Sequence, residues 1–250
     1  NKYLSSYKIN DNLNNSKILG TMKIIVNDKI DIYKYDNVEV TGDHLVKINN
    51  KYLRIKEVPN IEKTNKYISN LYCLITDNNL IKINNTIFRD YKETNDSLLL
   101  AYVNYFVNED LNKNKVNNNK KLKHYINHCS LPCFNRKTYN YLLKKYKNQI
   151  NGIIELAPDN IELYKYKNNI FNKNILVYEE ETQLWKRIWM IEEAIKIENN
   201  EEILYNIMLK NSNILELENN IKIRDFEETS SEEVNDKINA MIINNLNNYF

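Results

Sequence analysis

Residues Arg89–Thr94 read Arg-Asp-Tyr-Lys-Glu-Thr, and residues Arg224–Thr229, 135 positions later, read Arg-Asp-Phe-Glu-Glu-Thr. An internal repeat sets the number of domains, so it is weighed before any other signal. The period is far longer than the roughly 20–50 residues of solenoid repeats. We therefore predict two domain-sized units in tandem.

Shorter matches on either side of this motif support the repeat. They keep the same order along the chain, and their offset varies only between 131 and 133 residues, as small loop insertions would produce. The matched segments are Tyr33–Tyr35 with Tyr164–Tyr166, Leu71-Tyr72 with Leu204-Tyr205, and Gly20 with Gly152.

Short segments rich in Ile, Val, Tyr and Leu, separated by Asn- and Asp-rich turns, are typical of strands. We expect a mainly β fold with short helices, in which unit one spans residues 1–96 and unit two spans 131–230. Between them, residues 97–130 combine a helical or strand-like stretch with a polar linker at 108–123. Residues 231–250 are predicted to form a C-terminal helix, because Ser231 can cap it and apolar residues follow at helical spacing. We expect no counterpart of this length after unit one.

The composition excludes several classes of function. A formal net charge of +2 in 250 residues gives no basic stripe for nucleic acid. No apolar run approaches the ~18–20 residues that a membrane-spanning helix needs. Three scattered glycines cannot form a phosphate-binding loop, so no nucleotide cofactor is expected. An odd number of cysteines, three, does not make a secreted disulfide framework, and we expect a reducing, intracellular compartment.

One segment carries a recognisable pattern. Residues Val38–Val46 read Val-Glu-Val-Thr-Gly-Asp-His-Leu-Val, a strand that ends in Thr-x-x-His and continues into a second strand. This segment resembles the Hint superfamily, the fold shared by hedgehog autoprocessing domains and inteins. Segments Leu71–Thr76 and Ile87–Glu93 resemble the closing segments of Hint-like proteins carried by large DNA viruses. The resemblance covers about the first hundred residues and extends, more weakly, through the repeat.

The resemblance implies a specific chemistry. In that family a Cys or Ser at the first position of the domain attacks the preceding carbonyl, and the Thr and His polarise and protonate the scissile amide. Thr41 and His44 would take those roles in unit one, whose nucleophile would lie at or just before Asn1. Cys133 resembles the opening nucleophile of unit two. The positions of Thr41 and His44 are there occupied by Asn172 and Ile175, so neither unit carries the complete catalytic set.

A second interpretation competes for Cys133. His124, His128, Cys129 and Cys133 fall within ten residues, and histidines four apart share one face of a helix, as many zinc ligands do. The sequence therefore also predicts a possible zinc site. The alternative is a polar linker that happens to hold two of the three histidines.

Four further residues are expected to have structural roles. Asp90 and Asp225 of the repeated motif are expected to stabilise a turn or an ion pair rather than act as bases. Cys73 lies in an apolar strand and is expected in the core. Trp185 occupies roughly the place of Tyr52 in the repeat, which also favours core packing.

Three functional hypotheses follow. The first is a catalytically degenerate Hint-like structural protein that binds other proteins of a larger assembly, such as a minor virion or capsid-associated component. The second is a self-cleaving module that uses Thr41 and His44 with a nucleophile upstream of Asn1. The third is a protein-binding module stapled by zinc.

Overall fold

The computed structural model describes residues 3–26, 29–64, 66–113, 131–229 and 231–248. In this part of the chain the fold is mainly β, with 19 strands in several antiparallel sheets and three α-helices. The mainly β class and the C-terminal helix predicted from the sequence are confirmed. No helix among these residues is long and apolar enough to cross a membrane.

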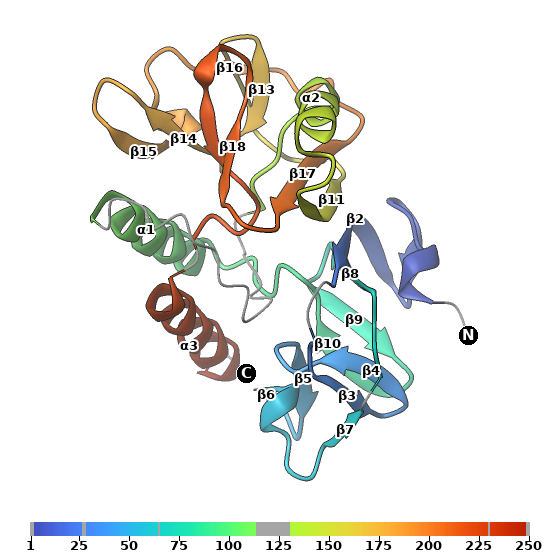
Figure 1. Cartoon of the computed structure of the whole chain (residues 1–250). Helices are drawn as coiled ribbons and strands as arrows, with labels where there is room; N and C mark the ends of the chain where they lie inside the picture. Colours follow the sequence, from blue (N-terminus) through green and yellow to red (C-terminus); the bar gives the residue numbers. More distant parts are fainter. Residues whose placement is uncertain (1–2, 27–28, 65, 114–130, 230, 249–250) are drawn as a thin grey trace.

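A central antiparallel sheet joins the two units (Figure 1). Its inner strands, β2 and β11, pair with Met22 opposite Ile154, and each is flanked by a strand of its own unit, β8 or β17. Met22 and Ile154 occupy the same position in the repeat, so the units are related by an approximate two-fold axis between these residues. The strands are β1 (Asn12–Leu13), β2 (Ser16–Ile25), β8 (Asn70–Thr76), β11 (Ile150–Leu156) and β17 (Leu204–Leu209).

Each unit adds two small sheets in the same strand order. Unit one has β4-β3-β7 and β6-β5-β10-β9, and unit two has β13-β12-β16 and β15-β14-β19-β18. Unit one contains β3 (Ile32–Tyr35), β4 (Val38–Thr41), β5 (Leu45–Ile48), β6 (Lys51–Arg54), β7 (Glu62–Thr64), β9 (Leu80–Ile83) and β10 (Thr86–Arg89). Unit two contains β12 (Leu163–Tyr166), β13 (Asn169–Asn172), β14 (Leu176–Glu179), β15 (Leu184–Arg187), β16 (Ile195–Ile197), β18 (Ile214–Glu216) and β19 (Lys222–Arg224). The repeat in the sequence is thus matched by a repeat in strand pairing, and residues at the same pairing position are called counterparts below.

Asparagine takes the place of glycine in the tight turns. In the hairpins β3–β4 and β5–β6, the pairs Asp36-Asn37 and Asn49-Asn50 both have φ between 46° and 64°. Two successive residues with positive φ are what a type I′ hairpin turn requires, and Asn tolerates this conformation better than other residues that have a Cβ. A chain with three glycines therefore still makes many short hairpins.

The helices are exchanged between the units. α1 (Ser97–Lys113) follows unit one but packs on β15 of unit two, whereas α3 (Glu232–Asn248) follows unit two and packs on β6 of unit one. Asn112 bonds both main-chain groups of Trp185 at 2.8 and 3.2 Å, and Asn247 bonds both main-chain groups of Tyr52 at 2.7 and 3.1 Å. The two helices lie side by side in Figure 1 and share one apolar core with Tyr52 and Trp185.

Two expectations from the sequence are wrong. The C-terminal helix does have a counterpart of its own length, because α1 and α3 each have 17 residues. The polar segment predicted to be a linker from residue 108 begins as helix, since α1 continues to Lys113 and buries Leu111. A third helix, α2 (Arg136–Tyr146), was not predicted; the Asn135 side chain caps it by accepting from the Thr138 N–H at 3.1 Å.

Candidate functional site

A tight turn between β4 and β5 places Thr41 and His44 together. The His44 N–H donates to the Thr41 carbonyl at 3.3 Å, and the Ile55 N–H donates to the His44 carbonyl at 2.9 Å. A Cβ at position 42 would lie 2.9 Å from the ring of Tyr33, so any residue larger than glycine would force the turn or the ring to shift. The Thr-x-x-His pattern therefore forms a fixed turn at the end of a strand, as the sequence predicted.

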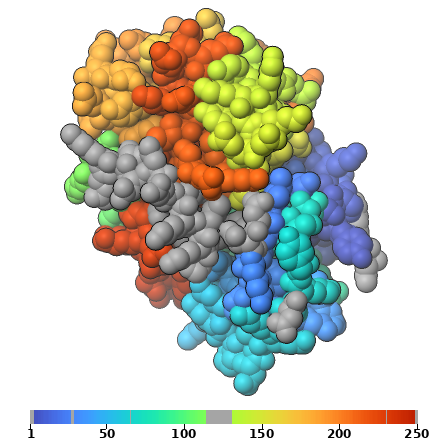
Figure 2. Space-filling view, in the orientation of Figure 1, coloured from blue at the N-terminus to red at the C-terminus, as the bar shows by residue number. Residues whose placement is uncertain are grey.

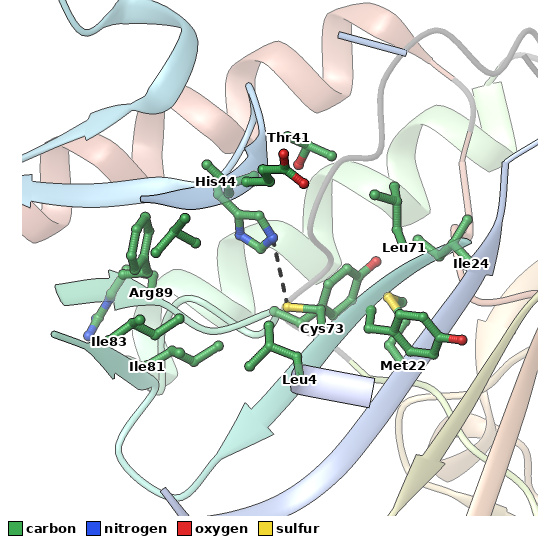
Figure 3. Close-up of a pocket in the computed structure, with 16 residues that line it drawn as sticks. Leu4, Met22, Ile24, Thr41, His44, Leu71, Cys73, Ile81, Ile83 and Arg89 are labelled. Atoms are coloured by element: carbon green, nitrogen blue, oxygen red, sulfur yellow. Dashed lines mark hydrogen bonds between the residues drawn. The ribbon is translucent and has the colours of Figure 1, made fainter. Parts of the chain in front are cut away.

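Both residues line a cavity of about 90 Å³ in unit one (Figure 3). One wall is β4, and the opposite wall is β8 with Leu71, Tyr72 and Cys73. Apolar side chains from β2, β9 and β10 also line it, as does Leu4 near the N-terminus. We call this space the β4–β8 gap. Its lining is mostly apolar, and its polar side chains are those of Glu39, Thr41, His44, Tyr72, Cys73, Arg89 and Tyr91.

His44 points at Cys73, with 3.9 Å between Nε2 and Sγ (Figure 3). Burial and, to a lesser extent, the charge of Arg54 lower the pKa of His44 to about 4, while the charge of Asp43 opposes the shift. Burial also raises the pKa of the Cys73 thiol. At neutral pH the pair is therefore a neutral imidazole beside a neutral thiol, which is neither an activated nucleophile nor a protonated general acid.

Cys133 lies in unit two and is not brought together with Thr41 and His44. Its N–H donates to the side chain of Asn172 at 2.9 Å, and the amide of Asn172 donates to the Leu131 carbonyl at 2.8 Å. Asn172 is the counterpart of Thr41. Cys133 is fully buried, and burial raises the pKa of its thiol.

The aspartates of the repeated motif hold the backbone, as expected. Asp90 accepts hydrogen bonds from the main-chain N–H groups of Thr76, Lys92 and Glu93 at 2.6–3.0 Å. Asp225 accepts from the N–H groups of its own unit, including that of Leu209 at 3.0 Å. Burial raises the pKa of Asp90, and these hydrogen bonds oppose the rise. Both carboxylates are fully buried, which favours the structural role over a catalytic one.

The glutamate of the same motif makes a buried ion pair that the sequence did not reveal. Glu93 pairs with Arg54, and Glu228 pairs with Arg187 in the same geometry. All four side chains are at most 5% exposed. Both glutamates have positive φ, 60° and 54°, an uncommon conformation for a residue with a Cβ. Two features of the repeat could have indicated this pair: both copies of the motif end in Glu-Thr, and both units have an arginine at the matching position, Arg54 or Arg187.

Three of the four residues predicted as zinc ligands, His124, His128 and Cys129, lie outside the described residues, so the zinc hypothesis stays a prediction. Within the described residues no group of three or more His, Cys, Asp or Glu side chains is placed to hold a metal ion. Cys73 was predicted in the core and is 6% exposed, but its position beside His44 was missed. Trp185 is 3% exposed and is the counterpart of Tyr52, which confirms its packing role.

Comparison with known proteins finds no matching family model, no similar curated protein and no similar solved structure. The likeness to the Hint superfamily therefore stays a prediction that rests on Val38–Val46 and the segments around it.

Proposed function

We propose that this chain is a non-catalytic assembly protein, built on a duplicated Hint-like scaffold, that binds other proteins of a larger complex. The observation that carries the proposal is the division of the catalytic residue types between the units. Thr41 and His44 lie in unit one, while Cys133 is buried in unit two, where Asn172 and Ile175 occupy the positions of Thr41 and His44. A neutral His44 and a protonated, fully buried Cys133 supply no acid and no nucleophile.

What both units share supports a structural role. Each keeps its Arg–Glu ion pair, its backbone-binding aspartate and its exchanged helix. These features stabilise the fold and expose no reactive group. The assembly that the resemblance implies is a virus particle, and mass spectrometry of purified particles from the source tests that placement.

One observation favours the self-cleaving alternative. The β4–β8 gap lies beside Thr41 and His44, and an upstream Cys could enter it. A fusion in which a reporter protein is joined through a single Cys to Asn1 tests this directly. We expect intact mass and N-terminal sequencing to show an uncut fusion both in the wild-type sequence and in His44→Ala. Release of the reporter in the wild type, abolished by His44→Ala, would replace the proposal with the alternative.

A further inference from the structure

The helix α1 exposes apolar side chains on the side that faces solvent. Leu98, Tyr102 and Tyr105 are 65%, 50% and 57% exposed. They follow one another at the spacing of one helical turn and therefore lie along one side of the helix. The residues buried in the core shared with α3, such as Val103 and Val107, lie on the other side. A helix that is apolar on both sides is typical of one that is covered on both sides.

The 3₁₀ helix η3 (Ile188–Met190) continues this apolar surface. It follows β15, the strand of unit two on which α1 packs. Trp189 is 55% exposed and Met190 is 48% exposed, and Trp189 lines a surface hollow together with Ala101 of α1. Atoms of α1, in green, reach the surface at the edge of the molecule in Figure 2, beside unit two in orange. We call the five exposed residues the α1–η3 face: Leu98, Tyr102, Tyr105, Trp189 and Met190.

The repeat provides an internal comparison for this face. In the other half of the molecule α3 packs on β6, and the 3₁₀ helix η2 (Ile55–Glu57) follows β6 as η3 follows β15. The counterparts of the five residues, at the same offsets as the helices that carry them, are exposed and, with one exception, charged: Glu233, Lys237, Ala240, Lys56 and Glu57. Since the two helices and their strands pack alike, the fold does not require apolar side chains at these positions. The apolar character of the α1–η3 face therefore indicates a binding role.

The size of the face matches a dimer interface of ordinary size. An aromatic side chain offers about 150–250 Å², so the five residues, each about half exposed or more, present roughly 500 Å² of mostly apolar surface. Apolar atoms make up about 56–65% of a protein interface. A face of this size therefore implies roughly 800 Å² for each partner, which is the standard value for a specific interface.

The arrangement of the face suits a second copy of the same chain. Leu98 and Tyr105 lie about one helical turn before and after Tyr102. Two antiparallel α1 helices that cross at Tyr102 would place Leu98 of each copy against Tyr105 of the other, and a two-fold interface requires such self-complementary pairing. The charged counterparts on α3 and η2 would limit the assembly to two copies, because a second apolar face at the related position would extend it into an open chain.

We propose that the chain forms a symmetric dimer through the α1–η3 face, with the α1 helices of the two copies packed antiparallel. Two-fold dimers are the commonest symmetric assemblies of identical chains. This inference goes beyond the proposed function, since self-association needs no other protein.

The first test measures the mass of the full chain by size-exclusion chromatography with light scattering. The protein concentration is varied between about 1 and 100 µM, because interfaces of this size have dissociation constants in the micromolar range or below. We expect twice the 30.0 kDa of one chain at the upper concentrations. If dilution dissociates the dimer within this range, the mass should fall toward that of one chain.

The double variant Leu98→Glu with Tyr102→Lys gives α1 the residues Glu233 and Lys237 of its counterpart α3. It should weaken dimerisation at least about 100-fold, because each substitution enters a two-fold interface twice and replaces a buried apolar side chain by a charged one. A Glu followed by a Lys four residues later stabilises a helix, so the loss cannot be attributed to unfolding of α1. The matched control is Tyr67→Lys, the same substitution at a residue of unit one that is 79% exposed, which should leave dimerisation unchanged.

Tryptophan fluorescence shows whether the dimer uses this face. The chain has two tryptophans, of which Trp185 is 3% exposed and Trp189 is 55% exposed in the single chain. Quenching by acrylamide therefore reports on Trp189. We expect weak quenching in the dimer and stronger quenching in the double variant at every concentration.

Any of four results overturns the proposal: the mass of one chain at about 100 µM, a mass that rises beyond two copies, a dimer that the double variant does not weaken, or a dimer in which Trp189 is quenched as readily as in the double variant. A single chain at every concentration would assign the α1–η3 face to a different protein or to another part of this chain.

Discussion

Neutralising one partner of a buried ion pair should reveal how much the repeated Arg-Asp-x-x-Glu-Thr motif contributes to stability. The variants are Glu93→Gln in unit one and Glu228→Gln in unit two. Glutamine keeps the shape of the side chain and the same preference against positive φ, so the change isolates the charge. The partners Arg54 and Arg187 would remain buried, with their charges unpaired.

The magnitude follows from the burial of these side chains. Removing one partner of a buried pair typically costs about 3–5 kcal/mol, because the remaining charge is left desolvated. Glu228→Gln should lie at the upper end. Arg54 would keep hydrogen bonds to Asn239 of α3 and to the Asp43 carbonyl, whereas Arg187 would keep only the Asn174 carbonyl among its recorded partners in the described chain.

The assay is urea unfolding followed by circular dichroism and tryptophan fluorescence, with the m-value checked for constancy. A loss of about 3–5 kcal/mol is a large share of the roughly 5–15 kcal/mol that stabilises a typical domain. The matched control is Asp31→Asn, which removes an exposed ion pair to Lys63 in which both side chains are about half exposed. It should cost less than about 1 kcal/mol.

The double variant Arg54→Met with Glu93→Leu separates the charge from the packing. Replacing both partners by apolar residues should recover most of the loss, since neither residue of the pair then leaves an unpaired charge buried. A single variant that costs less than about 1 kcal/mol, or a double variant that is no more stable than Glu93→Gln, would refute this account of the motif.

Three other predictions concern the central sheet that joins the units, the exchanged helices and His44. Gly20→Ala should lower the free energy of unfolding by about 1–3 kcal/mol, because the new Cβ would lie 2.7 Å from a carbonyl oxygen of β11. Gly152→Ala should cost clearly less, because its new Cβ would lie 3.3 Å from the nearest atom. Thermal unfolding of the two variants makes the comparison. Asn112→Ala and Asn247→Ala should lower the free energy of unfolding by similar amounts, about 1–3 kcal/mol each. Each variant removes two hydrogen bonds between an exchanged helix and a strand. Chemical denaturation measures both losses. NMR titration should give His44 a pKa of about 4. Stability should fall as the pH drops from about 6.5 to 4, because in this range the unfolded chain binds a proton at His44 that the folded chain does not. His44→Gln should remove this part of the pH dependence.

The sequence predicted what depends on local pattern. Alternating apolar residues indicated strands, the repeated motif indicated two units, and Ser231 with the residues after it indicated the C-terminal helix. The same repeat also contained the counterpart of that helix. Val103, Val107 and Leu111 are buried on α1, and the residues 135 positions later, Ile238, Ile242 and Leu246, are buried on α3. The residue types differ between the two helices and only their helical spacing is shared, so residue identity alone does not reveal this match.

Other features could not be predicted from local pattern. The exchange of helices depends on which unit each helix reaches in space, and no periodicity encodes that choice. The ion pair of Arg54 with Glu93 joins residues 39 positions apart that no charge spacing connects. The sequence suggested Cys133 as a nucleophile and His44 as a general acid, but it could not show that Cys133 is fully buried in unit two while His44 lines a cavity in unit one.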